Sequence, residues 1–106
     1  MSHEDLNPIN FTLSDRAIAA IADMNRQAEE EAGTLYWPCI MWAYIRNSAP
    51  ESGGVGIGYM ERDRVDPVHL SQIGDFKFIY GVIERDQPHF AGKTLDMQDG
   101  RLVLVN

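Results

Sequence analysis

Thr34-Leu-Tyr-Trp-Pro-Cys-Ile-Met-Trp-Ala-Tyr-Ile-Arg46 is an apolar run, and a polar loop, Asn47-Ser-Ala-Pro-Glu-Ser-Gly-Gly54, separates it from a second run, Val55-Gly-Ile-Gly-Tyr-Met-Glu-Arg-Asp63. Two β-rich segments on either side of a Pro, Ser and Gly cluster indicate a hairpin with a long loop. In the first run, apolar side chains occupy both alternating sets of positions. We therefore expect this strand to be covered on both faces, by a helix on one and by a second sheet or another subunit on the other.

Proline and glycine shape this hairpin further. Pro38 has no N–H for a β-ladder, so we expect the strand to begin after it, or the proline to mark a bulge or an edge. In the return strand, Gly56 and Gly58 leave one face bare, which allows another backbone or the helix to approach closely. A phosphate-binding loop is disfavoured because no helix and no Gly-Lys-Ser/Thr follow these glycines.

An amphipathic helix is predicted between Ser14 and Gly33. Ser14 is a good N-cap, Asp15 suits the positive end of the helix dipole, and Gly33 suits a left-handed C-cap. Apolar side chains recur at three- and four-residue spacings at Ala17, Ile18, Ile21, Met24 and Ala28. A short strand at Phe11–Leu13 is expected before the helix. Residues 1–10 form a polar lead that we expect to be mobile.

The segment after the central hairpin is predicted to alternate loops and strands. Arg62–Gly74 is polar and contains Asp66-Pro67, which favours a loop, with one helical turn at Val68–Gln72. Asp75–Val82 is typical of a buried strand.

The end of the chain carries the clearest hairpin signal. Lys93–Met97 and Arg101–Val105 are strand-like runs around an Asp99-Gly100 turn. Between them and the preceding strand, Ile83–Phe90 is ambiguous. Any helix there is expected to stop by Asp86, since the residue before Pro88 is disfavoured in helical conformation.

Length and charge limit the classes of partner. The chain has 106 residues with 44% hydrophobic content, which suits one domain, expected over residues 11–106. Its net charge of −7 disfavours nucleic acid and anionic membranes as partners. The first residues lack the basic start and apolar core of a signal peptide, and no apolar stretch approaches the ~20 residues of a membrane span. We therefore expect a cytoplasmic protein.

The titratable residues do not form a recognisable catalytic or metal site. Cys39 is the single cysteine, and His3, His69 and His89 lack metal-ligand spacing. Cys39 is therefore interpreted as a small buried apolar side chain. Asp86 and His89 are three residues apart, but Pro88 disrupts the helical geometry that would align them for proton transfer. No catalytic residue, cofactor-binding residue, cofactor or metal ligand is predicted.

Aromatic residues are concentrated in the first strand of the hairpin. Trp37, Trp42 and Tyr44 fall within a few positions of one another, where they serve either core packing or a partner surface. Tryptophan and tyrosine are enriched at the centres of protein interfaces. We therefore take these three residues as the candidate partner surface, for a second copy, another protein or a small ligand.

The order of elements resembles a known family. A short strand with Thr-Leu-Ser (12–14), an alanine-rich helix and a hairpin are followed by a strand near Phe76–Val82, and then by Phe90-Ala-Gly-Lys-Thr-Leu-Asp96 running into Gly100-Arg-Leu-Val-Leu104. This pattern resembles the HesB-like domain of the A-type iron–sulfur carriers. The resemblance implies a small HesB-like β-sandwich of α+β or mainly β class, with one N-terminal helix, a short second helical turn and commonly dimers.

The resemblance does not extend to the cluster ligands. In that family the hairpin loop supplies one cysteine and a Cys-Gly-Cys tail two more, and thiolates hold the cluster. Here the loop reads Asn47-Ser-Ala-Pro-Glu-Ser-Gly-Gly54 and the last strand ends the sequence at Asn106.

Three hypotheses about function follow. The leading one is a non-enzymatic binding or assembly domain that keeps the carrier scaffold without its cysteines. The alternative is an iron–sulfur or metal protein that uses Cys39 at a subunit interface, with His89 or an acidic residue. An enzyme that uses the hairpin loop with Asp86 and His89 is the third.

Overall fold

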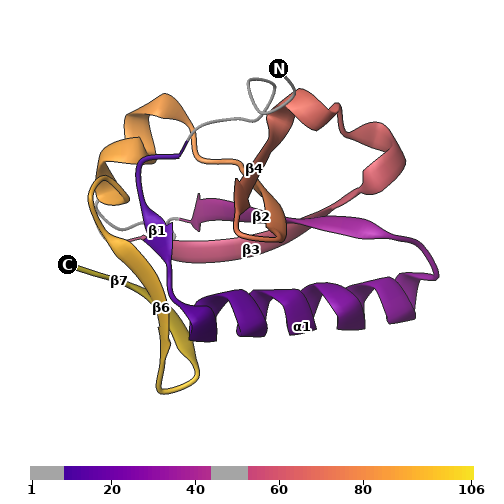
Figure 1. Cartoon of the computed structure of the whole chain (residues 1–106), viewed down its shortest axis with the longest axis horizontal. Helices are drawn as coiled ribbons and strands as arrows, with labels where there is room; N and C mark the ends of the chain where they lie inside the picture. The colour runs from indigo at the N-terminus through magenta and orange to yellow at the C-terminus, as the bar shows by residue number, and fades with distance from the viewer. Residues whose placement is uncertain (1–8, 44–52) are drawn as a thin grey trace.

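The chain forms one long helix and two β-sheets, which confirms the predicted α+β class (Figure 1). The computed structural model describes residues 9–43 and 53–106. The first sheet has the strand order β1-β6-β7, with β1 at Thr12–Leu13, β6 at Thr94–Gln98 and β7 at Arg101–Val105. The second has the order β3-β2-β5-β4, built from Gly54–Glu61, Tyr36–Ala43, Phe76–Tyr80 and Leu70–Ile73.

The helix α1 spans Asp15–Ala32, and both predicted caps are confirmed. Ser14 Oγ accepts a hydrogen bond from the Ala17 N–H at 3.1 Å. Gly33 adopts the left-handed conformation with φ 70°, and its N–H donates to the Glu29 carbonyl at 2.8 Å. No helix in residues 9–43 and 53–106 combines the length and apolar character needed to cross a membrane.

The core lies where α1 meets both sheets. From α1, Ala17 and Ile21 are fully buried. They belong to one cluster with the aromatic and aliphatic side chains of the strands, among them Phe11, Ile40, Phe78, Phe90 and Leu95. The ring centroids of Phe11 and Phe90 are 5.1 Å apart at 60°, an edge-to-face contact that joins the residue before β1 to the segment before β6. Figure 1 shows α1 lying along β2 and β3 with β6 at its N-terminal end.

The predicted lead, residues 1–10, falls outside the described residues except for Ile9 and Asn10. Ile9 packs against the core. The Asn10 side chain accepts a hydrogen bond from the Tyr80 hydroxyl at 3.0 Å and donates one to the Gln87 carbonyl at 3.2 Å. These contacts begin the packed part of the chain two residues before Phe11.

The central hairpin forms as predicted, but Pro38 does not have the predicted role. β2 begins at Tyr36, before the proline, and lies in the interior of its sheet rather than at an edge. The Arg62 N–H bonds to the Leu35 carbonyl and the Gly81 N–H to the Ile40 carbonyl. The backbone N–H and C=O groups of the odd-numbered residues of β2 therefore point toward β3, and those of the even-numbered residues point toward β5.

The missing N–H of Pro38 thus falls on the β5 side, where it is tolerated because β2 and β5 pair only at Cys39–Ile79 and Ile40–Tyr80. The sheet opens between the two strands at Pro38. The proline limits the ladder instead of delaying the strand.

The segment after the hairpin was predicted as a loop with one helical turn, and it also contains a strand. The helical turn expected at Val68–Gln72 is a 3-10 turn, η4, at Pro67–His69, and β4 follows at once as Leu70–Ile73. The Asp66 side chain caps this turn by accepting a hydrogen bond from the Val68 N–H. The turn does not continue as a longer helix, because the residues that follow it pair with β5. A preceding 3-10 turn, η3, covers Arg62–Arg64.

The helical stretch expected to stop by Asp86 instead continues as 3-10 helix η5 over Glu84–His89. Pro88 fits inside this 3-10 helix because other residues donate the neighbouring backbone hydrogen bonds. The N–H groups of Asp86 and Gln87 bond to the Ile83 carbonyl, and that of Phe90 bonds to the Gln87 carbonyl.

The C-terminal hairpin is confirmed. Thr94 pairs with Val105 and Gln98 with Arg101 in an antiparallel register. Asp99 and Gly100 have φ values of 52° and 76°, as the tight turn between twisted strands requires.

Candidate functional site

A cleft of about 490 Å³ lies where the start of β3 approaches β7. It is lined by Trp42 near the end of β2, by Gly53 and the first two residues of β3, Gly54 and Val55, by His89 of η5, by Lys93 before β6, and by Arg101–Leu104 of β7. Five separate parts of the chain therefore converge on it. Its volume lies within the range of about 300–1,000 Å³ that is usual for small-ligand sites.

One wall of the cleft is an aromatic stack. The rings of Trp42 and His89 have centroids 4.2 Å apart and are nearly parallel at 4°. On its core side Trp42 meets the edge of the Phe90 ring at 5.9 Å. The stack is thus fixed from within the core, and it gives the cleft a flat and rigid surface.

Gly53 allows the chain to approach this stack closely. A Cβ at position 53 would lie 2.6 Å from Trp42 Nε1 and 2.4 Å from the Ala43 carbonyl oxygen, so glycine is required there. Trp42 Nε1 is buried and has no acceptor among the described residues. A buried N–H of this kind is a donor that an incoming oxygen would satisfy.

Among the described residues that line the cleft, the charged side chains are all basic. The chain has nine Lys and Arg residues, of which Arg46 lies outside the described residues. Among the other eight, the five that form ion pairs are Arg16, Arg26, Arg62, Arg64 and Arg85. Within the described ranges Lys77, Lys93 and Arg101 form none, and Lys93 and Arg101 both line the cleft, where no Asp or Glu accompanies them.

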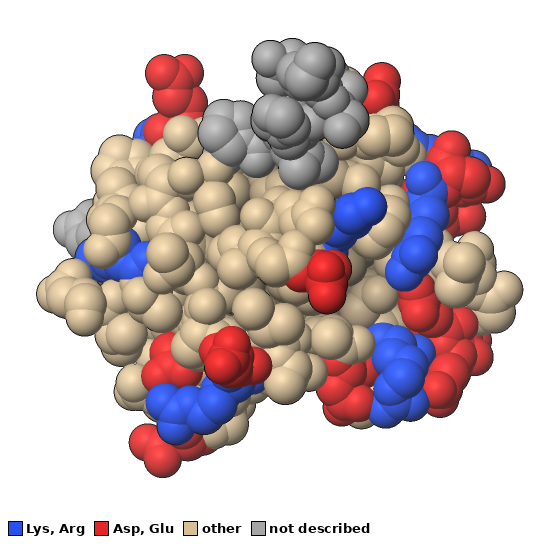
Figure 2. Space-filling view, in the orientation of Figure 1, with Lys and Arg blue, Asp and Glu red and all other residues tan. Residues whose placement is uncertain are grey.

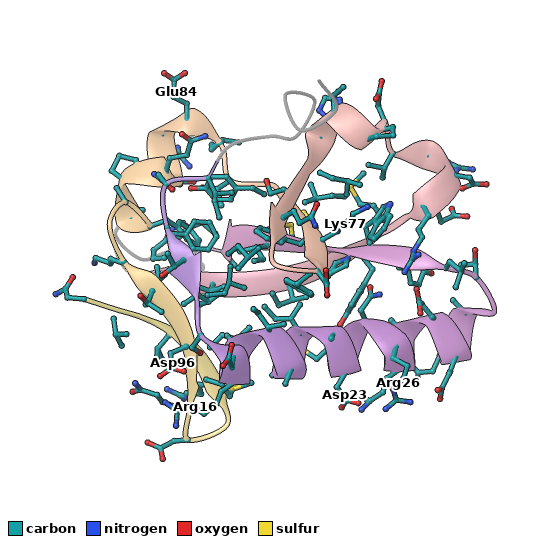
Figure 3. The ribbon with its side chains drawn as sticks, in the orientation of Figure 1. Arg16, Asp23, Arg26, Lys77, Glu84 and Asp96 are labelled. Carbon is teal, nitrogen blue, oxygen red and sulfur yellow. The ribbon has the colours of Figure 1, made fainter. Side chains whose placement is uncertain are left out.

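Elsewhere on the surface, opposite charges lie together. Figure 2 shows red and blue side chains intermixed along the border formed by α1 and the β6–β7 hairpin. Figure 3 shows Arg16 beside Asp96 and Asp23 beside Arg26, with Lys77 on β5 away from both pairs. The cleft differs from these regions because its cations have no such neighbour in the part of the chain that the structure describes.

A second hollow, of about 280 Å³, lies where the sheet opens at Pro38. There α1 side chains replace the missing ladder bonds. Glu29 Oε2 accepts from the Tyr36 N–H at 2.8 Å, and Asn25 Nδ2 donates to the Tyr36 carbonyl at 3.0 Å. Arg62 donates to the same carbonyl at 3.1 Å and lies 4.1 Å from the centre of the Trp37 ring. These partners give the hollow a structural role.

The aromatic residues predicted as one partner surface do not lie on one face. Trp42 points into the main core, whereas Trp37 packs with Cys39, Leu70 and Ile79 on the opposite face of β2. Tyr44 lies outside the described residues. Trp42 therefore belongs to the cleft and Trp37 to the second hollow, and their role toward a partner stays a prediction.

The candidate acid–base pair is divided between two environments. Asp86 is 3% exposed, and its carboxylate accepts from Arg85 Nε at 3.3 Å. His89 is half-buried against Trp42 and lines the cleft. His69 is on η4, and His3 lies outside the described residues.

Cys39 has the surroundings of a core residue. Its side chain is buried, and burial raises the pKa of the thiol, which disfavours the thiolate that binds metals. Gly81 packs directly on the sulfur. No three His, Cys, Asp or Glu side chains cluster at metal-binding distance in the described ranges. This donor set does not fit an iron–sulfur cluster.

Sequence reasoning missed Lys93 and Arg101. Each follows a left-handed glycine, Gly92 with φ 70° and Gly100 with φ 76°, and each stands at the start of the C-terminal hairpin strands. Their distance in sequence from Trp42 conceals the fact that the fold brings them to one cleft. The one available signal was that two of the few basic residues flank the same predicted hairpin.

Comparisons with known proteins bear on the fold alone. No protein-family model and no curated protein matches the chain. The chain is similar to a protein from Aquifex aeolicus, a Northeast Structural Genomics Consortium target solved by solution NMR, with a TM-score of 0.56 and 16% identity over 94% of each chain. The same arrangement of helix and strands therefore occurs in a solved protein of nearly the same extent.

Proposed function

We propose that this protein is a non-enzymatic binding domain that holds an anionic group in the cleft beside Trp42. One observation carries the proposal. The cleft contains two of the three described Lys and Arg residues that form no ion pair, and none of the described residues that line it is a carboxylate. The net charge of the chain is −7, so a cleft whose described charged side chains are cationic is the position where an anion is favoured.

The chemistry of the lining supports binding rather than catalysis. Its side chains are aromatic, aliphatic or basic, together with glycine. Among the described residues, it offers no Ser, Thr, Cys, Asp or Glu that would serve as a nucleophile or a carboxylate base. Lys93 and Arg101 supply hydrogen-bond donors with positive charge, which are the strong partners of carboxylate and phosphate.

We also propose that the scaffold is HesB-like but lacks the ligands of the iron–sulfur carriers. The order of elements around Phe90–Asp96 and the α+β fold support this proposal. The buried Cys39 counts against the alternative, an intersubunit metal site. Protein purified without oxygen is expected to be colourless and free of stoichiometric iron, whereas colour that Cys39→Ser abolishes would restore that alternative.

Charge-removing variants test the anion site. Binding of inorganic phosphate is measured by calorimetry for the wild type, for Lys93→Gln with Arg101→Gln, and for Lys77→Gln. A hydrogen bond to a charged group contributes about 1.5–3 kcal/mol. Since about 1.4 kcal/mol is tenfold in affinity, the double variant is expected to bind at least ~10-fold more weakly.

Lys77→Gln is the matched control, because Lys77 also lacks an ion pair in the described ranges but lies outside the cleft. It should bind phosphate as the wild type does. Equal weakening by Lys77→Gln and by the double variant would show that only the overall charge matters, and it would overturn the proposal.

A further inference from the structure

We propose that the anionic group enters the cleft as part of an extended acidic peptide, whose backbone pairs with the free edge of β3 alongside β7. This inference rests on the proposed function and specifies the class of ligand. It follows from the hydrogen-bonding parity of the two strands, which determines where their unpaired peptide groups point.

The free edge of β3 follows from its pairing with β2. The Arg62 N–H bonds to the Leu35 carbonyl, so even-numbered residues of β3 bond to β2 along the antiparallel register. The peptide groups of Val55, Ile57 and Tyr59 consequently face away from β2. β3 is the outer strand of its sheet, so these groups have no ladder partner in the described chain.

The free edge of β7 follows from the same reasoning. The carbonyls of Lys93 and Leu95 accept bonds from the Thr12 and Ser14 N–H groups of the β1 segment. Even-numbered residues of β6 therefore bond to β7, and Asp96 pairs with Val103 in that register. The peptide groups of Leu102 and Leu104 consequently face away from β6.

Both free edges reach the cleft. Val55 lines it from β3, and Leu102 and Leu104 line it from β7. The lining of β7 runs over four residues, Arg101–Leu104, or about 10 Å at ~3.3 Å per residue, enough for three or four residues of an extended chain. Exposed edges are commonly blocked by Pro or Lys, yet β3 contains neither. An added strand is the ligand form that such edges bind.

The charge of the cleft selects an acidic peptide. Lys93 and Arg101 provide two unpaired cations, so a peptide with carboxylate side chains complements the site and a basic one is repelled. The flat Trp42–His89 stack and the leucines of β7 suit apolar side chains at alternate positions. A peptide of alternating acidic and apolar residues therefore matches both features.

Matched peptides separate backbone pairing from charge. The probes are an acetylated and amidated pentapeptide of alternating valine and aspartate, the same peptide N-methylated at alternate residues, and inorganic phosphate. N-methylation removes backbone donors and keeps every carboxylate. We expect the unmodified peptide to bind at least tenfold more tightly than the methylated one, and both to weaken in the Lys93→Gln, Arg101→Gln double variant.

A protein variant tests the same edge. Val55→Pro removes an outward N–H that β2 does not use, and Val55→Ala keeps it. Val55→Pro, with its fold checked by circular dichroism, should weaken the unmodified peptide several-fold more than Val55→Ala does. If Val55→Pro does not fold, the methylated peptide still decides the question.

The outcomes distinguish the two proposals. Equal affinity for both peptides, still lost in the double variant, would overturn strand pairing and leave the anion site intact. If the Lys93→Gln, Arg101→Gln double variant bound every probe as tightly as the wild type does, the anion site and the peptide proposal would both be overturned.

Discussion

Gly81 illustrates how closely single residues are fitted around the buried cysteine. A Cβ at this position would lie 2.5 Å from Cys39 Sγ, and the Gly81 N–H bonds to the Ile40 carbonyl. Gly81→Ala is therefore expected to lower the free energy of unfolding by about 1–3 kcal/mol through overpacking. Urea denaturation measures the effect, with Gly56→Ala as control because a Cβ there would make an ordinary contact of 3.5 Å.

We attribute this expected loss of stability to contact with the Cys39 sulfur, and the same substitution in a Cys39→Ala background tests that cause. In Cys39→Ala protein the clash is absent, so Gly81→Ala should become much milder. A loss of the same size in both backgrounds would assign the glycine's role to backbone conformation instead.

Asp96 anchors the start of α1 to β6 and makes stability depend on pH. Its carboxylate accepts from Ser14 Oγ at 2.6 Å, from Gln98 at 3.2 Å and from Arg16 at 2.7 Å. The hydrogen bond from Ser14, followed by that from Gln98, holds the pKa of Asp96 well below its usual range, while burial opposes this shift.

A depressed pKa in the folded state stabilises the protein above the unfolded pKa of about 3.9 and ceases to do so as the pH falls toward the folded value. Asp96→Asn should therefore destabilise the protein at pH 7 and by progressively less in acid below the unfolded pKa. Unfolding curves across that pH range measure the difference in free energy of unfolding between the wild type and Asp96→Asn, with Asp23→Asn at an exposed position as the control. A difference in free energy of unfolding that does not become smaller in acid would contradict a stabilising role for the ionised Asp96.

Residue type alone could predict some of these roles and not others. Ser14 and Gly33 were identifiable as caps because capping depends on local backbone geometry. Lys93 and Arg101 were not identifiable as a pair, because their proximity to Trp42 depends on how two sheets meet. Trp37 and Trp42 stood out by composition, but the alternation of β2 sends them to opposite faces.

At the scale of elements, α1 stabilises the place where β2 and β5 separate. The Tyr36 N–H has Glu29 Oε2 as its acceptor at 2.8 Å, and the Glu29 side chain is 17% exposed. Glu29→Ala would leave this N–H unpaired, at an expected loss of about 1–3 kcal/mol. Glu30→Ala is the control on the same helix, since it removes only an exposed pair with Arg26 of about 0.3–0.5 kcal/mol.

Chemical denaturation of the two variants provides the comparison. Similar small losses for Glu29→Ala and Glu30→Ala would mean that water satisfies the Tyr36 N–H without help from α1.

The elements with strong local signals were predictable. The helix had both caps and a 3.6-residue period, and the last hairpin had an Asp-Gly turn. β4 was missed because its four residues, Leu70–Ile73, carry too short a pattern and become a strand only by pairing with β5. Pro38 was misjudged because its tolerance depends on which neighbouring strand its peptide faces.

At the scale of the whole molecule, the distribution of charge matters more than its sum. The net charge of −7 led to the expectation of no nucleic-acid partner, yet it concealed a local basic cleft. The resemblance to HesB-like domains rests on the order of elements and one short C-terminal motif. That resemblance stays a proposal, since the similarity to the Aquifex aeolicus protein concerns the fold alone.

The two tryptophans make the central claim directly measurable. In ¹⁵N-correlated NMR spectra each indole N–H gives its own signal, and Trp42 lines the cleft whereas Trp37 lines the second hollow. On titration with phosphate, the Trp42 indole and the Gly53 and Gly54 amides are expected to shift saturably while the Trp37 indole stays in place. Equal movement of both indoles, or no saturable shift at Trp42, would contradict an anion site in the cleft.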